Sequence, residues 1–256
     1  MSDSLVKTVF QDAIYTVTLA RPVKRNAVND RLLAALEAAL NNQPESTRVI
    51  VLTAEGEHFC AGLDLSEHQH RDPYGVTQHS QWWHRVFHRI EHGGVPVVAA
   101  LHGAVIGGGL ELAAATHVRV AEPSAFYQLP EGRHGIFVGG GASVRVSKII
   151  GPGRMCEMML TGRVVNAEEG QRLGLSHYLV GNNQGRDKAR ELAQQIAQNA
   201  PLANWAMVTA IDRIHQMASD QGLYVESLTA ALTQTGPEVR ARIAQFLQRK
   251  GKGPQT

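Results

Sequence analysis

The N-terminal part of the chain alternates short apolar runs with polar turns. β-Branched and aromatic residues predict two paired strands over 5–10 and 13–19, with Gln11-Asp12 as the tight turn between them. Leucines then recur with a helical period over residues 30–41, and Asn29 can cap the first turn of that helix. Two strands followed by a helix are therefore the expected opening of the fold.

The same succession returns in the middle of the chain. Strands are expected at 48–53, 95–101 and 118–120, and helices at 78–91, 109–116 and 142–149. Because strands come in pairs before some of the helices, the pattern predicts an α/β protein of repeated β-β-α turns rather than an ordinary doubly wound sheet.

From about residue 186 the pattern becomes purely helical. Four segments are expected, separated by breaks that include Pro201 and Gly236-Pro237: 186–199, 201–219, 221–235 and 237–250. Their apolar stripes leave two possibilities open. They pack against another subunit, or they cap the core of their own chain.

Composition and charge exclude several classes of protein. Hydrophobic residues make up 43% of the 256 residues and charged residues 19%, which suits a packed core. Lysine and arginine (25) nearly balance aspartate and glutamate (23), so nucleic acid is not an expected partner. Cys60 and Cys156 lack the spacing of a disulfide framework or a zinc ribbon. No signal peptide or membrane-spanning run is evident, and a soluble cytoplasmic protein is expected.

Glycine is the unusual component of the sequence. Of the 25 glycines, 12 fall within residues 93–151, and they include triplets at 107–109 and 139–141. Glu111 and Glu131, 20 residues apart, each lie near one triplet. The first triplet joins an expected strand to a helix, where free N–H groups could hold a phosphate or a developing oxyanion. A tight packing turn is the alternative, and no Walker lysine follows the glycines.

Three longer motifs carry a resemblance to a known family. They are FCAGLDL at 59–65, HGAVIGGGLELAAATHVRVAE at 102–122 and LPEGRHGIFVGGG at 129–141. In this order and spacing they are similar to the enoyl-CoA hydratase/isomerase (crotonase) superfamily. Shorter matches near both ends extend the resemblance over nearly the whole chain.

The resemblance implies both a fold and an assembly. The expected fold is α/β, a crotonase-like spiral of β-β-α units over residues 1–193. A C-terminal helical trimerisation region would follow over 194–256. The helical tail would then serve assembly, as a homotrimer or a dimer of trimers.

The resemblance also implies an active site. The backbone N–H groups of Leu63 and Gly108 would form an oxyanion hole for a thioester carbonyl, and losing one such donor typically costs about 3 kcal/mol. Glu111 and Glu131 would share a water molecule, one as base and the other as acid, with Gly139 helping to hold the site. Two carboxylates in one closed pocket raise each other's pKa, which would let one stay protonated as the acid while the other acts as the base.

Coenzyme A enters as part of the acyl-CoA substrate, and no separate cofactor and no metal are expected. Two loops and two residues of a neighbouring subunit's last helix are expected to bind it: Arg25 to Ala27, Ala61 with Gly62 and Asp64, and Phe246 with Arg249. Having both glutamates favours hydration of a 2-enoyl-CoA. Isomerisation, hydrolysis and retro-aldol cleavage are the alternatives on the same scaffold, ahead of a non-catalytic or RNA-binding relative.

The sequence departs from the family pattern at a few positions. Val138 stands where a proline usually precedes the glycines, Ser66 stands near the place of a common lysine, and Ala142–Arg145 replaces the usual polar and basic residues. These departures leave the acyl group of the substrate open.

Other residues with chemical potential receive plainer interpretations. His84, His88 and His92 recur at intervals of four. A metal site is conceivable, but no acidic partner is expected in phase, so a solvated helix face is the preferred reading. Trp82 or Trp83 could shape the acyl pocket, although core packing is the more common role of a tryptophan. Cys60 lacks a neighbouring base and is not expected to be a nucleophile.

Overall fold

The structure, a computed structural model, describes residues 4–67 and 71–251. Its larger sheet has six strands in the order β1-β2-β3-β4-β6-β9. They span Val6–Gln11, Ile14–Leu19, Val49–Ala54, Val97–Leu101, Val118–Ala121 and Tyr178–Leu179. β1 runs antiparallel to β2, and the other neighbours are parallel. Parallel neighbours require crossover connections, which the helices supply.

A smaller sheet lies beside the first. It contains β5 (Ala104–Ile106), β7 (Phe126–Gln128) and β8 (Val165–Asn166), and a bridge from Cys60 to Val105 extends it. The chain thus passes from β3 to Cys60, from β4 to β5 and from β6 to β7, visiting the large sheet and then the small one each time. This alternation confirms the spiral of β-β-α units.

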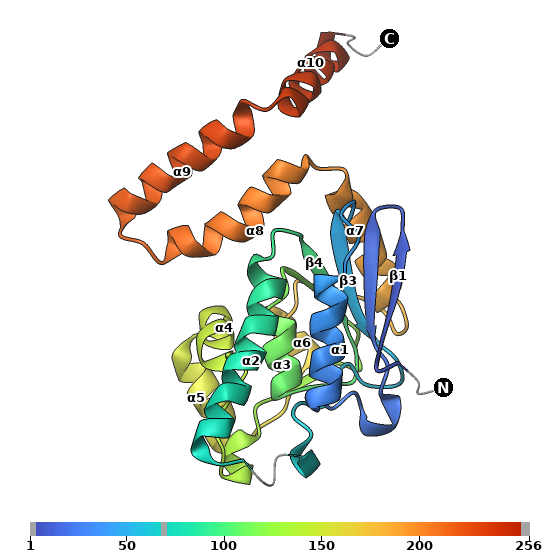
Figure 1. The fold of residues 1–256 in the computed structure, drawn as a ribbon, viewed down its shortest axis with the longest axis vertical. Helices are drawn as coiled ribbons and strands as arrows, with labels where there is room; N and C mark the ends of the chain where they lie inside the picture. Colours follow the sequence, from blue (N-terminus) through green and yellow to red (C-terminus); the bar gives the residue numbers. More distant parts are fainter. Residues whose placement is uncertain (1–3, 68–70, 252–256) are drawn as a thin grey trace.

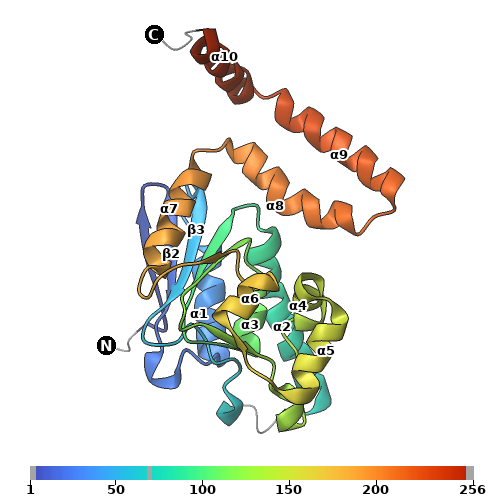
Figure 2. The same cartoon turned by 180° about the vertical axis from the view of Figure 1, so that it is seen from behind.

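Helices cover both faces of the large sheet (Figure 1 and Figure 2). The helices of the core are α1 (Asp30–Asn41), α2 (Pro73–His92), α3 (Gly108–Ala114), α4 (Ala142–Ile150), α5 (Pro152–Thr161), α6 (Ala167–Arg172) and α7 (Gly185–Ala197). Along β3, Val49 and Val51 pack towards α7, whereas Ile50 and Leu52 belong to the main core with α1 and α2. Alternate strand residues point to opposite faces, so both faces must be apolar.

The C-terminal helices extend away from this core in both views (Figure 1 and Figure 2). They are α8 (Pro201–His215), α9 (Ser219–Gln234) and α10 (Pro237–Gly251). α9 leaves apolar side chains such as Leu223, Tyr224 and Leu228 more than half exposed. The expected boundary after residue 193 falls inside α7, whose Leu192 and Ala193 pack on the sheet. That division of the chain stays a prediction.

Several element boundaries differ from those expected, including the end of α8 at His215, and two of the differences have a clear local cause. The hairpin turn is made by Asp12 and Ala13, which both have positive φ, rather than by Gln11-Asp12. α2 begins at Pro73 instead of residue 78, because Asp72 accepts a capping bond from the Gly75 N–H and a proline is favourable in the first turn. Within the described ranges, no helix has the length and apolar character of a membrane span.

Candidate active site

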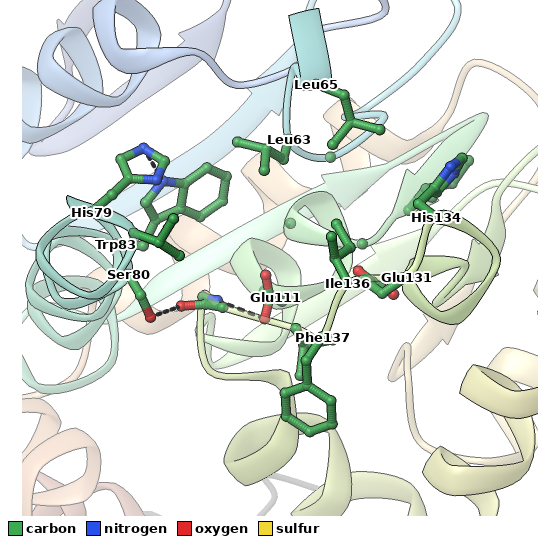
Figure 3. A pocket seen from close by; sticks show the side chains of 18 of the residues that line it. Leu63, Leu65, His79, Ser80, Trp83, Glu111, Glu131, His134, Ile136 and Phe137 are labelled. Atoms are coloured by element: carbon green, nitrogen blue, oxygen red, sulfur yellow. Dashed lines mark hydrogen bonds between the residues drawn. The ribbon is translucent and has the colours of Figure 1, made fainter. Parts of the chain in front are cut away.

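A cavity of about 780 Å³ lies between α2, the Ala61–Leu63 loop and the segment that leads into α4 (Figure 3). Seven of the residues expected from the sequence line it: Ala61, Gly62, Leu63, Gly108, Glu111, Glu131 and Gly139. They come from four separate places in the chain. The fold therefore brings the expected oxyanion-hole residues and both glutamates to one cavity.

The N–H groups of Leu63 and Gly108 meet because Gly62 allows a close approach. Gly62 has a φ of +91°, and a Cβ there would stand 2.7 Å from the Ile106 carbonyl oxygen. A Cβ on Gly108 would lie 3.4 Å from the Leu63 nitrogen, which places the two amides side by side. Among residues 4–67 and 71–251, neither N–H has a hydrogen-bond acceptor. Unpaired donors at the wall of a cavity are available to a ligand oxygen.

Glu111 is held by the backbone in front of α4. It is 3% exposed, and its Oε1 accepts the N–H of Gly140 at 2.8 Å and that of Ala142 at 3.0 Å. Burial raises its pKa above the ordinary value, while these two N–H groups and the charge of Arg145 act in the opposite direction. The hydrogen bonds thus favour the ionised form in a place where burial alone would neutralise it.

Glu131 lies in a different environment. It begins the short helix η3 (Glu131–His134), is 8% exposed, and its Oε2 has no partner among the described residues. Burial raises the pKa of Glu131 to about 7, with a further contribution from the charge of Glu111. Gly107 makes this position possible, since its φ is +50° and a Cβ there would stand 2.8 Å from Glu131 Oε1. Burial thus raises the pKa of both carboxyls; Glu111 is held by two backbone N–H groups, and the pKa of Glu131 lies near neutral pH.

The two loops expected to bind coenzyme A lie against each other. The Ala61 N–H donates to the Arg25 carbonyl at 3.0 Å, and the Val28 N–H donates to the Gly62 carbonyl at 2.7 Å. Ala61 and Gly62 line the cavity, but Arg25, Ala27 and Asp64 do not.

The side chain of Asp64 has an internal partner. Its carboxylate accepts from Arg21 Nη1 at 2.7 Å and from Ser66. These hydrogen bonds lower the pKa of Asp64, and the one from Ser66 has the larger effect. Asp64 therefore shapes its loop through a salt bridge, and any contact with a ligand would come from its backbone.

Sequence reasoning missed the role of Asn26 in holding these loops. Asn26 is fully buried in a left-handed conformation; its Nδ2 donates to the carbonyls of Glu55 and His58, and its Oδ1 accepts the Arg21 N–H. The sequence places Asn26 inside the expected Arg25 to Ala27 loop, but it gives no sign of these hydrogen bonds.

The residues expected from the last helix lie apart from the cavity of their own chain. Phe246 and Arg249 are on α10, which both whole-molecule views place well outside the core (Figure 1 and Figure 2). Their side chains are outside the described part of the structure. A contact with coenzyme A in a neighbouring subunit stays a prediction.

The tryptophans and histidines of α2 divide between the cavity and the surface. Trp83 lines the cavity, and its indole N–H donates to His79 Nε2 at 3.1 Å, whereas Trp82 donates to Glu37 and does not line it. The expectation that the histidines lack an acidic partner is wrong. Glu91 brings a ligand atom within 4.8 Å of one on His88 and one on His92.

Cys60 fits its expected inert role. It is fully buried, its thiol donates to the Asn26 carbonyl, and burial raises its pKa to about 12. A thiol in this state is a poor nucleophile.

A β-β-α spiral with paired N–H donors and two buried carboxylates in one cavity is the arrangement of the crotonase fold. The family model for enoyl-CoA hydratase/isomerase matches residues 9–252. A crystal structure from Rhodopseudomonas palustris, of a protein classed with the enoyl-CoA hydratases, superposes with a TM-score of 0.94 at 51% identity, covering 97% of this chain and 96% of that one.

Curated relatives agree with this match. The short-chain-enoyl-CoA hydratase of Clostridium acetobutylicum is 32% identical over 84% of this chain and 83% of its own length. The 2,3-dehydroadipyl-CoA hydratase of Escherichia coli is 30% identical over 98% of this chain and 97% of its own. The chain belongs to the enoyl-CoA hydratase/isomerase family.

Proposed function

We propose that the chain is an enoyl-CoA hydratase, which adds water syn across the double bond of a 2-enoyl-CoA thioester. The observation that carries this proposal is the difference between its two buried carboxyls. Glu111 accepts two backbone N–H bonds, while Glu131 has a pKa of about 7 and an oxygen without a partner in the described part of the chain. Hydration needs one group that accepts a proton and one that donates it.

The proposed reaction uses each feature of the cavity once. The N–H groups of Leu63 and Gly108 bind the thioester oxygen and stabilise the negative charge that develops there as an enolate. Ionised Glu111 takes a proton from water, and the water oxygen bonds to the β-carbon. Protonated Glu131 gives its proton to the α-carbon, which restores the thioester carbonyl. Coenzyme A is part of the substrate, and these steps use no further cofactor.

Other reactions of the superfamily share the same pair of N–H donors. Isomerisation, hydrolysis and cleavage of a hydroxyacyl-CoA are the alternatives that the fold allows. The names of the relatives from Clostridium acetobutylicum and Escherichia coli are both those of hydratases, and the presence of two glutamates supports the same choice. They differ in substrate, so they leave the acyl group open.

The test is an assay of crotonyl-CoA and longer 2-enoyl-CoAs, followed by loss of the conjugated enoyl thioester absorbance. Glu111→Gln and Glu131→Gln should each lower kcat by about 10²- to 10⁴-fold, the usual contribution of a general acid or base. Glu168→Gln makes the same chemical change at an exposed site on α6 and should leave kcat unchanged. A wild-type protein that hydrates none of these substrates would refute the proposal.

We also propose that the protein works as a homotrimer or a dimer of trimers. The support is the apolar surface of the C-terminal helices, where Trp205, Ile211, Leu223 and Leu232 are between 44% and 64% exposed. Apolar surface of this extent is typical of a subunit interface. Light scattering should give three or six times the chain mass of 27.8 kDa, and a monomer across the concentration range of the assay would contradict it.

A further inference from the structure

The loop of residues 139–141 leads into α4, and its Gly140 N–H donates a hydrogen bond to Glu111. Each of its three glycines meets a side chain from α2 or α4. Ser80 Oγ donates to the Gly139 carbonyl at 2.6 Å, and Arg145 Nη1 donates to the Gly140 carbonyl at 3.1 Å. The orientation of the Gly140 N–H, and therefore the position of the Glu111 carboxylate, depends on the contacts that fix this loop.

Arg145 is the charged residue among these contacts. Its side chain is only 10% exposed, and its Nε donates to Glu91 Oε2 at 2.7 Å, near the end of α2. Gly141 has a φ of +107°, and a Cβ there would collide with Arg145 Nη1, so the guanidinium lies directly against the loop. One planar group thus joins the loop to α2 through two N–H bonds in fixed directions.

We propose that Arg145 is a positioning residue for Glu111: by fixing the loop of residues 139–141, it keeps the N–H groups of Gly140 and Ala142 directed at the Glu111 carboxylate. The inference rests on the proposed hydratase function and extends it to a residue that does not line the cavity. Its charge acts in the same direction as its geometry, because Arg145 lowers the pKa of Glu111 against the effect of burial.

Other charged and titratable groups surround Arg145, and they bear on any pH dependence. α2 contributes Glu91, which pairs with Arg145, and His84 and His88, whose pKa values are lowered mainly by burial and further by the Arg145 charge. His92 lies 3.6 Å from Glu91 Oε2. Beyond them, Lys148 of α4 pairs with Asp212 of α8 at 2.7 Å.

The Lys148–Asp212 pair supplies the matched control. Lys148→Met removes one positive charge from the same helix and touches no residue of the loop, whereas Arg145→Met removes both the charge and the bond to Gly140. Arg145→Lys keeps the charge but cannot reach Glu91 and Gly140 with the same planar fork.

The first measurement is the pH profile of kcat and KM with crotonyl-CoA. Arg145→Met should lower kcat by about 10- to 100-fold with KM within about threefold, as expected for a misplaced catalytic group. The low-pH limb of kcat should move to higher pH, because Glu111 loses a favourable charge. Arg145→Lys should lower kcat with the limb near its wild-type position, and Lys148→Met should change neither. If Arg145→Met is unfolded, the kcat of Arg145→Lys tests the inference instead: a lowered kcat supports it, and a wild-type kcat overturns it.

Wild-type kcat and an unmoved limb in Arg145→Met would overturn the inference, and so would an equal loss in Lys148→Met. A second readout does not depend on turnover. The Glu111 carboxyl, followed by ¹³C NMR and assigned through Glu111→Gln, should titrate at higher pH in Arg145→Met. If the wild type hydrates no enoyl-CoA, the proposed function fails while this titration still tests the positioning role; an unchanged titration refutes that role.

Discussion

Replacing Glu131 by glutamine should make the folded protein more stable at alkaline pH while it removes activity. Glu131 is 8% exposed, and burial raises its pKa from an ordinary value of 4.5 to about 7. The folded state therefore binds a proton that the unfolded chain releases between these two pH values. In that window the free energy of unfolding falls by about 1.4 kcal/mol for each pH unit, a total of about 3 kcal/mol.

The sign follows from the raised pKa. The contribution of Glu131 is fully present below pH 4.5, decreases as the pH rises to about 7, and is then lost. Glutamine has no proton to lose, so the advantage of Glu131→Gln over the wild type should grow by about 3 kcal/mol between pH 4.5 and pH 8.

Urea denaturation followed by circular dichroism at both pH values measures this difference. The protein concentration must be held fixed, because any assembly makes stability depend on concentration. Glu168→Gln, the same change at an exposed position, should give a difference from wild type that does not vary with pH. An equally constant difference for Glu131→Gln would show that the Glu131 carboxyl ionises as it does in water, and would refute the assignment of Glu131 as the acid.

Three further outcomes follow from the same geometry. Activity of the wild type should fall about tenfold for each pH unit above 7, as Glu131 loses the proton it must donate; a flat kcat/KM profile up to pH 9 would contradict this. Gly107→Ala should lower kcat about 100-fold by displacing the Glu131 carboxylate, whereas Gly153→Ala, with open space around its Cβ, should be neutral in the same assay. Asn26→Ala should lower the free energy of unfolding by about 2 kcal/mol in urea titrations, against no comparable loss for the exposed Asn41→Ala.

Local signals explain what the sequence predicted well. Asn29 caps α1 through the Leu32 N–H, as its position before a leucine repeat indicates. The long, strongly apolar strands were also predicted. By contrast, β5 and β7 were not predicted. Each has only three residues, which is too short to show an alternating pattern, although both belong to the small sheet beside the site.

The sequence predicts which residues form the candidate site, but it does not predict their partners or pKa values. The motifs identify Leu63, Gly108, Glu111 and Glu131 through a family resemblance, and the fold brings these residues to one cavity. Nothing in the motifs shows that Asp64 pairs with Arg21 instead of facing a ligand. Such partners come from segments more than 40 residues apart, and a local pattern carries no information about them.

The sequence by itself determined the longer strands and helices, the glycine positions and the presence of two glutamates 20 residues apart, because these depend on local periodicity and on residue type. The tertiary structure alone decided how those glutamates differ. Glu111 meets the N–H groups of Gly140 and Ala142 and the charge of Arg145, while Glu131 is buried with one oxygen that has no partner among the described residues. A carboxyl's pKa is set by its solvation and by the dipoles and charges around it, and these exist only after distant segments have packed together.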